Sequence, residues 1–156
     1  MAFLNSLNIS ASGLTAQRQR LDIISENIAN IDTTRTEAGG PYRRKMVVFE
    51  DKAGDVPFKD ALRNTIVQRG PDGKLLRRTY SPGVRVSNII EDEAPFKLEY
   101  NPEHPDADEN GYVRRPNVNM LEETIDSISA TRSYQANVTV LNAVKAMATK
   151  ALEIGK

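Results

Sequence analysis

Residues 3–31, FLNSLNISASGLTAQRQRLDIISENIANI, are the stretch of sequence that decides the fold. Their apolar side chains occupy the two seam positions of a seven-residue repeat, Leu7, Leu14, Leu21 and Ile28 in one and Ile24 and Ile31 in the other. Such a repeat predicts a long amphipathic helix with a coiled-coil-like stripe. Ser10 and Gln17 interrupt the stripe, and Gly13, inside the pattern, costs about 1 kcal/mol relative to alanine. We therefore expect another helix to approach closely there.

A second long helix is predicted over about residues 118–154, at the other end of the chain. Asn119 followed by Glu122 resembles a capping box that opens a helix, and Gly155 provides a stop. At 1.5 Å per residue, this helix would be about 55 Å long. Its apolar residues start at Leu121, Ile125 and Ile128 and continue in two series displaced around the helix, Val138, Leu141, Ala148 and Leu152 or Ala130, Tyr134, Val144 and Ala151.

The apolar surface of this second helix is therefore wider than one stripe. If the two chain ends pair, each buries one stripe, and a second apolar face of the carboxy-terminal helix remains uncovered. That face packs either on another subunit or on the middle of the same chain. We favour another subunit, because exposed apolar faces usually mark interfaces.

Helix breakers define the segment between the two ends. All eight prolines and seven of the nine glycines fall between Gly39 and Pro116. Alternating apolar and polar residues at 45–49, 84–90 and 96–100 predict short strands in a small antiparallel sheet. We therefore predict an α+β fold in three parts, an N-terminal assembly helix (1–36), a β-rich middle domain inserted between the helices (37–116) and a C-terminal assembly helix (117–156).

The composition excludes several kinds of site. The 156 residues contain no cysteine, so disulfides, thiolate zinc sites and cysteine nucleophiles are ruled out. The 21 basic residues balance the 21 acidic ones, which disfavours binding of nucleic acid by bulk charge. No run approaches the roughly 20 apolar residues of a transmembrane segment, and residues 1–10 lack the basic start of a Sec signal peptide. No catalytic motif is present, so we expect a protein that is not an enzyme and has no cofactor or small-molecule substrate.

Charge inside the middle segment is sorted along the chain. Residues 63–85 hold six basic side chains against Asp72, and residues 91–109 hold eight acids against Lys97. These two segments could pair within one molecule, pair between neighbouring molecules, or form a solvated surface with partial pairing inside the chain. We favour the solvated surface, because exposed ion pairs contribute only about 0–1 kcal/mol. The stretch from Asp106 to Gly111 matches the first half of an EF-hand loop, but the second half fails, so we expect no metal. We expect the single histidine, His104, to hydrogen-bond locally in this loop.

Short motifs along the chain are shared with a known family. The amino-terminal motifs, residues 10–18 and 27–34, contain Gly13, Asn27 and an ANxxT sequence made by Ala29, Asn30 and Thr33. Further matches lie at 33–36, 39–45, 104–105, 111–113, 116–118, 129–137 and 151–156. In these motifs the chain resembles bacterial flagellar rod and hook proteins, and the middle motifs resemble a proximal-rod member. Asp32 departs from the family, which more often has asparagine there, and we expect only a local turn or cap to differ.

This resemblance implies a structural subunit of the flagellar basal-body rod, a drive shaft that crosses the periplasm and transmits torque. Family members leave the cytoplasm unfolded through the flagellar type III export apparatus, without a cleaved Sec signal, and nest their terminal helices into concentric tubes. The implied partners are further copies of the chain and other rod proteins. The expected assembly interface consists of Leu7, Leu14, Leu21, Ile24, Ile28, Ile31, Leu121, Ile125, Ile128, Tyr134, Leu141 and Val144. The alternative is a self-contained cytoplasmic helical adaptor, which would be folded and monodisperse alone.

Overall fold

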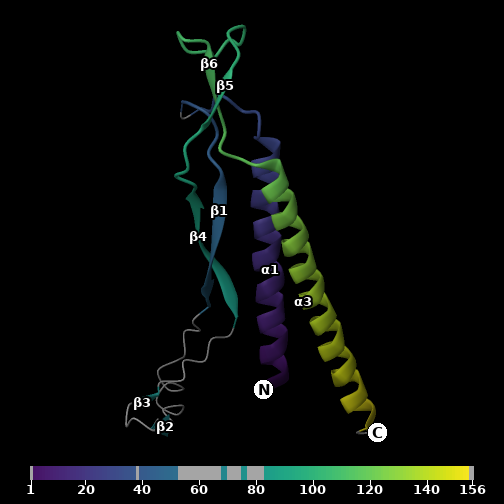
Figure 1. Ribbon diagram of the computed structural model, residues 1–156. Helices are drawn as coiled ribbons and strands as arrows, with labels where there is room; N and C mark the ends of the chain where they lie inside the picture. The colour runs from purple at the N-terminus through teal and green to yellow at the C-terminus, as the bar shows by residue number, and fades with distance from the viewer. Residues whose placement is uncertain (1, 38, 53–67, 70–74, 77–82, 155–156) are drawn as a thin grey trace.

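Two long helices dominate the computed structural model, which describes residues 2–37, 39–52, 68–69, 75–76 and 83–154. Helix α1 spans Ala2–Ala29 and helix α3 spans Met120–Ile154, and they lie side by side in opposite directions (Figure 1). At 1.5 Å per residue they are about 42 and about 52 Å long. Within the described residues, six short strands lie between them in the chain. The predicted α+β fold is confirmed.

The start of α3 is capped by Asn119. Its side-chain oxygen accepts a hydrogen bond from the backbone N–H of Leu121 at 3.1 Å, and its backbone oxygen accepts one from Glu123 at 3.0 Å. The amide nitrogen of Asn119 donates to the carboxylate of Glu122 at 3.2 Å. The predicted cap is therefore present, with the two side chains bonded to each other.

Small and branched side chains fill the seam between α1 and α3. Ala16, Ile24, Ala130 and Val144 are 3%, 5%, 0% and 7% exposed. The side chain of Asn137 in α3 packs against Gly13 of α1, where a Cβ added to the glycine would lie only 3.0 Å from the Asn137 side-chain oxygen. The close helix approach expected at Gly13 is confirmed, because an added Cβ would crowd the Asn137 side chain.

The strands pair antiparallel in three two-stranded ribbons. They are β1 (Lys45–Asp51) with β4 (Val84–Glu91), β2 (Gln68–Arg69) with β3 (Leu75–Leu76), and β5 (Lys97–Tyr100) with β6 (Tyr112–Arg115). The sequence predicted one small sheet instead. Pro95 lies in the irregular stretch between β4 and β5 and has no N–H to donate to a ladder. The β5–β6 hairpin therefore separates from the β1–β4 ribbon.

Helix α1 lies between the β1–β4 ribbon and α3 (Figure 1). The ribbon is held where β4 begins, because the backbone N–H of Val84 donates to the hydroxyl of Ser12 at 3.1 Å. The preceding residue, Gly83, has φ +143°, and an added Cβ would lie 2.1 Å from that hydroxyl oxygen. Only glycine allows so close an approach with this backbone conformation.

The β5–β6 hairpin is anchored at the start of α3. The ammonium group of Lys97 donates to the carbonyl of Val118 at 2.7 Å, and Val113 and Val118 are 2% and 1% exposed. This anchor places the hairpin beyond the ends of both helices (Figure 1).

Candidate subunit interface and the junction that positions it

Asn27 of α1 is the centre of a buried polar cluster. The side chain is 1% exposed and uses both of its polar atoms. Its oxygen accepts hydrogen bonds from the Tyr42 hydroxyl and the Lys45 N–H, both at 2.9 Å. Its nitrogen donates to the Lys45 carbonyl at 2.9 Å and to the Glu123 carboxylate at 3.1 Å. Asn27 thus ties together α1, the chain leading into β1, and α3.

Glu123 is a fully buried acid, 0% exposed, and its main partner is Arg44. The Arg44 Nε lies 2.5 Å from one Glu123 oxygen, and a second guanidinium nitrogen lies 3.3 Å from Asp126. Asp126 also accepts a hydrogen bond from Arg20 of α1 at 3.0 Å. We call Asn27, Tyr42, Arg44, Glu123 and Asp126 the polar junction. Its groups come from all three of the elements that it joins.

The ionisation of the junction reflects its burial. Burial lowers the pKa of Arg44, but the hydrogen bond to Glu123 and the charges of Glu123, Asp126 and Asp92 outweigh it, so that its pKa rises above the ordinary value. Burial, and then the nearby charges of Glu26, Glu123 and Glu91, raise the pKa of Tyr42 to about 12. Arg44 is therefore a cation and Tyr42 a neutral donor over the physiological range.

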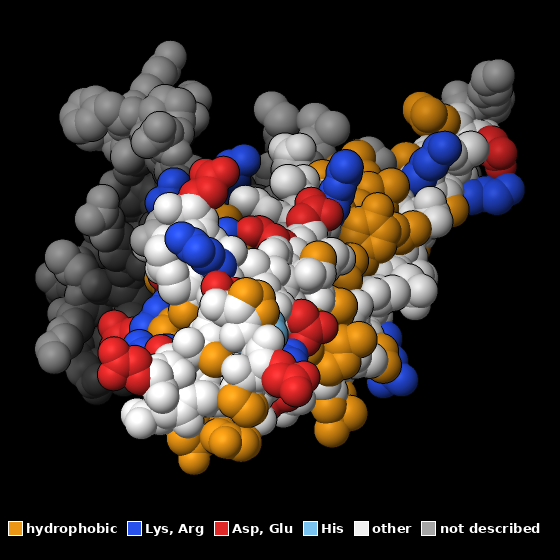
Figure 2. Space-filling view, turned by 90° about the horizontal axis from the view of Figure 1, so that it is seen from above, with side chains coloured by type: hydrophobic (Ala, Val, Ile, Leu, Met, Phe, Trp, Pro, Cys, Tyr) orange, Lys and Arg blue, Asp and Glu red, His pale blue; other side chains and the backbone are white. Residues whose placement is uncertain are grey.

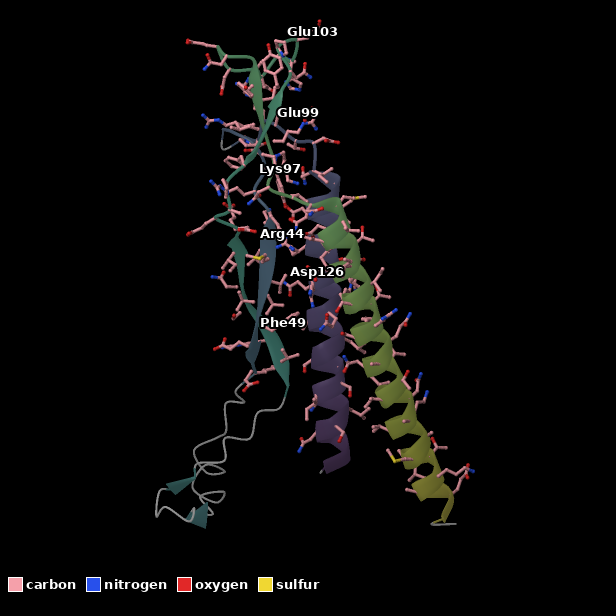
Figure 3. All side chains as sticks on the ribbon, viewed as in Figure 1. Arg44, Phe49, Lys97, Glu99, Glu103 and Asp126 are labelled. Carbon is pink, nitrogen blue, oxygen red and sulfur yellow. The ribbon has the colours of Figure 1, made fainter. Side chains whose placement is uncertain are left out.

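A cleft of about 330 Å³ lies beside the junction, lined by residues of α1, β1 and α3. Its lining mixes apolar side chains such as Ile24 and Phe49 with the charged groups Arg20, Arg44 and Asp126. Figure 3 labels Arg44, Phe49 and Asp126 among these. These charged groups pair with one another. Paired ions of this kind hold elements together and leave no free acid or base for chemistry.

Leu121, Ile125 and Ile128 form the outer face of α3, an apolar face that the single chain leaves exposed. These side chains are 68%, 59% and 49% exposed. The spacing of four and then three residues puts them on one helix face. Ile128 and the fully buried Ala130 are about 200° apart around the helix, so this face points away from α1. From the hairpin end, Figure 2 shows hydrophobic side chains gathered along α3 toward its free end.

The other residues of the expected interface lie closer to the seam. Ile24 and Val144 are buried between the helices, and Tyr134 is 36% exposed. The half-buried ones are Leu7, Leu14, Leu21, Ile28, Ile31 and Leu141. The structure therefore splits the expected set into an intrachain seam with half-buried flanks and an uncovered outer face.

Comparison with known proteins identifies the family. A model described as "Flagella basal body rod protein" matches residues 7–35, and one described as "Flagellar basal body rod FlgEFG protein C-terminal" matches residues 109–154. The flagellar basal-body rod protein FlgC of Bacillus subtilis is 49% identical over 160 residues, covering all of both chains. The chain belongs to the FlgC family of flagellar basal-body rod proteins. Proteins of the same name are 44% identical in Borreliella burgdorferi, covering 99% of this chain and 98% of that protein, and 42% identical in Escherichia coli O157:H7, covering all of both.

Membership of the FlgC family makes the chain a structural subunit of the flagellar basal-body rod, not an enzyme. It assembles with other rod components in the basal body. None of the helices in the described ranges is long and apolar enough to cross a membrane.

Asn30 and Thr33, two of the motif residues shared with rod proteins, form hydrogen bonds just beyond the end of α1. Asn30 donates from its side chain to the Glu26 carbonyl at 2.9 Å and accepts from the Thr33 hydroxyl at 3.1 Å. The Thr33 carbonyl accepts from the N–H of Tyr42 at 3.1 Å, which directs the chain into the junction. Ala29 is exposed at the end of the helix. Asp32 accepts a hydrogen bond from Arg115 at 2.6 Å, a long-range contact rather than a local cap.

Sequence reasoning missed most of the polar junction. Tyr42, Arg44 and Asn117 were noticed only as parts of motifs, and Glu123 and Asp126 had no assigned role. Asn117 accepts from the Arg44 N–H at 2.8 Å and donates to the carbonyls of Asp92 and Ala94 at 3.1 and 3.3 Å. The position of Glu123, next to the apolar residues of α3, could have suggested burial. An acid in the first turn of a helix is usually explained by its favourable interaction with the helix dipole, so this position alone did not indicate a buried ion pair.

The acidic loop behaves as a turn. The ring nitrogen Nδ1 of His104 accepts from the N–H of Asp106 at 3.1 Å, so the expected local hydrogen bond is confirmed. Asp106 also accepts from the Thr34 hydroxyl at 2.8 Å. Among the described residues, no group of three histidine or acidic side chains could hold a metal ion. Most of the basic stretch 63–85 lies outside the described residues; Arg85, at its end, pairs with Glu50 at 3.1 Å.

Proposed function

We propose that the subunit joins the rod through the outer face of α3. The observation that carries this proposal is the exposure of Leu121, Ile125 and Ile128 on the face turned away from α1. The seam with α1 already uses the opposite face, and the described residues leave these side chains uncovered, so the face is available to a neighbouring molecule. Because the family builds the rod, that neighbour is another rod subunit, either a further copy or a related rod protein.

The half-buried residues of α1 extend this surface. Leu7, Leu14, Leu21 and Ile28 repeat every seven residues and are only partly covered in the single chain. Completing the burial of one large apolar side chain is worth up to about 1.5–3 kcal/mol. The three outer-face residues of α3, each about half exposed or more, therefore supply a few kcal/mol for each contact, repeated at every subunit of the rod.

We infer that these contacts build a tube that transmits torque. Packed side chains are about as dense as an organic crystal and resist displacement, so interlocked helices turn as one body. The polar junction then carries the motion of the helices to the β1–β4 ribbon and the hairpin.

We further propose that the subunit reaches the part of the rod that crosses the periplasm through the flagellar type III export apparatus. The support is the membership of the rod-protein family. Fusion of the chain to a reporter that is active only outside the cytoplasm, expressed with and without the export apparatus, tests this route.

A charge placed on the outer face of α3 tests the interface. Ile125→Asp should abolish rod assembly and swimming when it replaces the wild-type chain in a bacterium that depends on it. Asn88→Asp adds a negative charge at an exposed position of β4, away from α3, and should swim normally. Both variants should show wild-type helix content and thermal unfolding. Normal swimming and normal basal bodies with Ile125→Asp would rule out the outer face as an interface.

A further inference from the structure

The β5–β6 hairpin carries an apolar patch of its own. Leu98, Tyr100 and Tyr112 are 66%, 65% and 44% exposed. Tyr100 pairs with Tyr112 across the hairpin and Leu98 pairs with Arg114, so all three apolar side chains share one face. The two tyrosine rings are in edge contact, with centroids 5.3 Å apart. We call these three residues the hairpin patch. Val113, on the opposite face, is the residue that anchors the hairpin and is 2% exposed.

Acidic side chains outnumber basic ones on the hairpin. Residues 97–115 hold five acids against Lys97, Arg114 and Arg115, and four of the five acids lie in the loop between β5 and β6. Glu99 pairs with Arg115, and Asp108 lies 3.9 Å from Arg114. Glu103 and Glu109 form no ion pair within the part of the chain that the structure describes. Figure 3 shows Glu103 at the tip of the hairpin and Glu99 closer to its base. The patch therefore suits a partner that is both basic and apolar.

The chain itself contains a segment of this chemistry. Residues 63–82 hold five basic side chains against one acid, Asp72. The same segment carries the apolar residues Ile66, Val67, Leu75, Leu76 and Tyr80. Its two described strands, β2 and β3, lie beyond the far end of the β1–β4 ribbon from the hairpin (Figure 1). The described strands of the segment, β2 and β3, thus lie far from the patch of their own chain.

We propose that the hairpin patch binds residues 63–82 of a second copy of the chain. The hairpin patch and the strands β2 and β3 lie at opposite ends of the molecule (Figure 1), so the contact joins copies head to tail. A contact of that kind repeats from one subunit to the next. It uses none of the residues of the outer face of α3, and its test needs no assembled rod.

Charge and apolar contact have different roles in this interaction. Exposed ion pairs are individually weak and are screened by salt. The apolar side chains therefore hold the segment, and the charges select it over other segments. A weak contact is sufficient in a rod, because neighbours already bound by their helices are held at high effective concentration.

Binding of a labelled peptide tests the patch. A fluorescent peptide of residues 63–82 is titrated into the full-length protein and followed by anisotropy. We expect saturable binding that weakens several-fold between about 0.05 and about 0.5 M NaCl. Leu98→Ser should weaken it at least about tenfold, a loss of about 1.4 kcal/mol. Leu152→Ser makes the same change at a side chain that is 76% exposed at the far end of α3, and should leave binding unchanged.

A second variant tests the charge without touching the apolar side chains. Glu103→Lys combined with Glu109→Lys should weaken the binding of the peptide and reduce its salt dependence. A scrambled peptide of the same composition should bind less tightly than the native one. Absence of saturable binding, or equal binding by the wild type and Leu98→Ser, overturns the proposal.

The cysteine-free chain allows a direct test of the second copy. Leu98→Cys and Arg77→Cys are made on separate chains, mixed and oxidised. We expect a disulfide-linked heterodimer, formed faster than the homodimer of either variant. If the chain carrying both substitutions closes only an internal disulfide and the mixture gives no heterodimer, the segment binds within one chain and the proposed occupant is wrong.

Discussion

Removing the positive charge from the polar junction should destabilise the whole fold. In Arg44→Met, the Glu123 carboxylate loses the guanidinium nitrogen that lies 2.5 Å away and keeps only the hydrogen bond from Asn27 at 3.1 Å. The carboxylate remains 0% exposed, so water cannot replace the lost partner without opening the junction. A buried charge without its counter-ion is among the most destabilising defects in a protein.

The size of the loss follows from these contacts. Removal of one partner of a buried ion pair costs about 3–5 kcal/mol. The side chain of Arg44 is 16% exposed, which favours the lower end of that range, about 3 kcal/mol. The second contact of Arg44, to Asp126, adds little because Asp126 is partly exposed and keeps Arg20. A domain of ordinary stability has about 5–15 kcal/mol in total, so the variant should be visibly weakened.

Chemical denaturation followed by circular dichroism measures this loss. Arg44→Met should lower the free energy of unfolding by about 3 kcal/mol. Arg85→Met removes an arginine from an exposed pair with Glu50 and should cost only about 0–1 kcal/mol. Adding Glu123→Gln to Arg44→Met removes the stranded charge and keeps an oxygen for Asn27, so it should recover most of the loss. A cost below about 1 kcal/mol for Arg44→Met, or no recovery in the double variant, would refute the reasoning.

Two further predictions concern Tyr42 in the polar junction and Gly83 beside the β1–β4 ribbon. The sequence has five tyrosines, and absorbance titration should show Tyr42 ionising near its raised pKa of about 12 while the folded protein persists. Because this pKa is higher in the folded state than the ordinary value of 10.0, the stability from Tyr42 is complete below pH 10.0 and is lost as the pH rises toward about 12; Tyr42→Phe should remove that pH dependence. Gly83→Ala should cost about 1–3 kcal/mol and loosen the ribbon from α1, since its Cβ would meet the Ser12 hydroxyl in a strained backbone. Hydrogen exchange at the amide of Val84 measures that loosening, and unchanged protection would contradict it.

The polar junction explains why a rod subunit needs more than two amphipathic helices. An apolar seam alone permits small slides and rotations, whereas the four hydrogen bonds of Asn27 require specific positions of Tyr42, Lys45 and Glu123. The Arg44 and Asp126 pair adds a second link between the chain before β1 and α3. A torque applied to the helices is therefore passed to the β-rich part through directional bonds.

Features that depend on neighbours along the chain could be predicted from the sequence. The seven-residue spacing of Leu7, Leu14 and Leu21 predicted a helix because the period matches the helical turn. Asn119 and Glu122 marked the start of α3 for an equally local reason. The second apolar face of the carboxy-terminal helix was also visible, because a helix that is apolar over a wide arc needs more than one partner.

The pairing of distant residues could not be predicted in this way. One small sheet was expected, and three ribbons formed, because strand propensity says nothing about which strands meet. Arg44 and Glu123 are 79 residues apart and Asn27 and Glu123 are 96 apart, so no local pattern connects them. An acid near the start of a helix is normally solvated.

By itself, the sequence determined the two helices, the strand-forming middle and the family, because these depend on periodicity, on helix breakers and on short motifs. Only the tertiary structure decided which face of α3 is covered, what Gly13 and Gly83 pack against, and that Glu123 is buried with Arg44. The physical reason is that the burial of a side chain depends on which segments pack together in the folded chain. Whether a charge is solvated or paired depends on which distant segment packs against it, and that is decided only when α1, β1 and α3 come together.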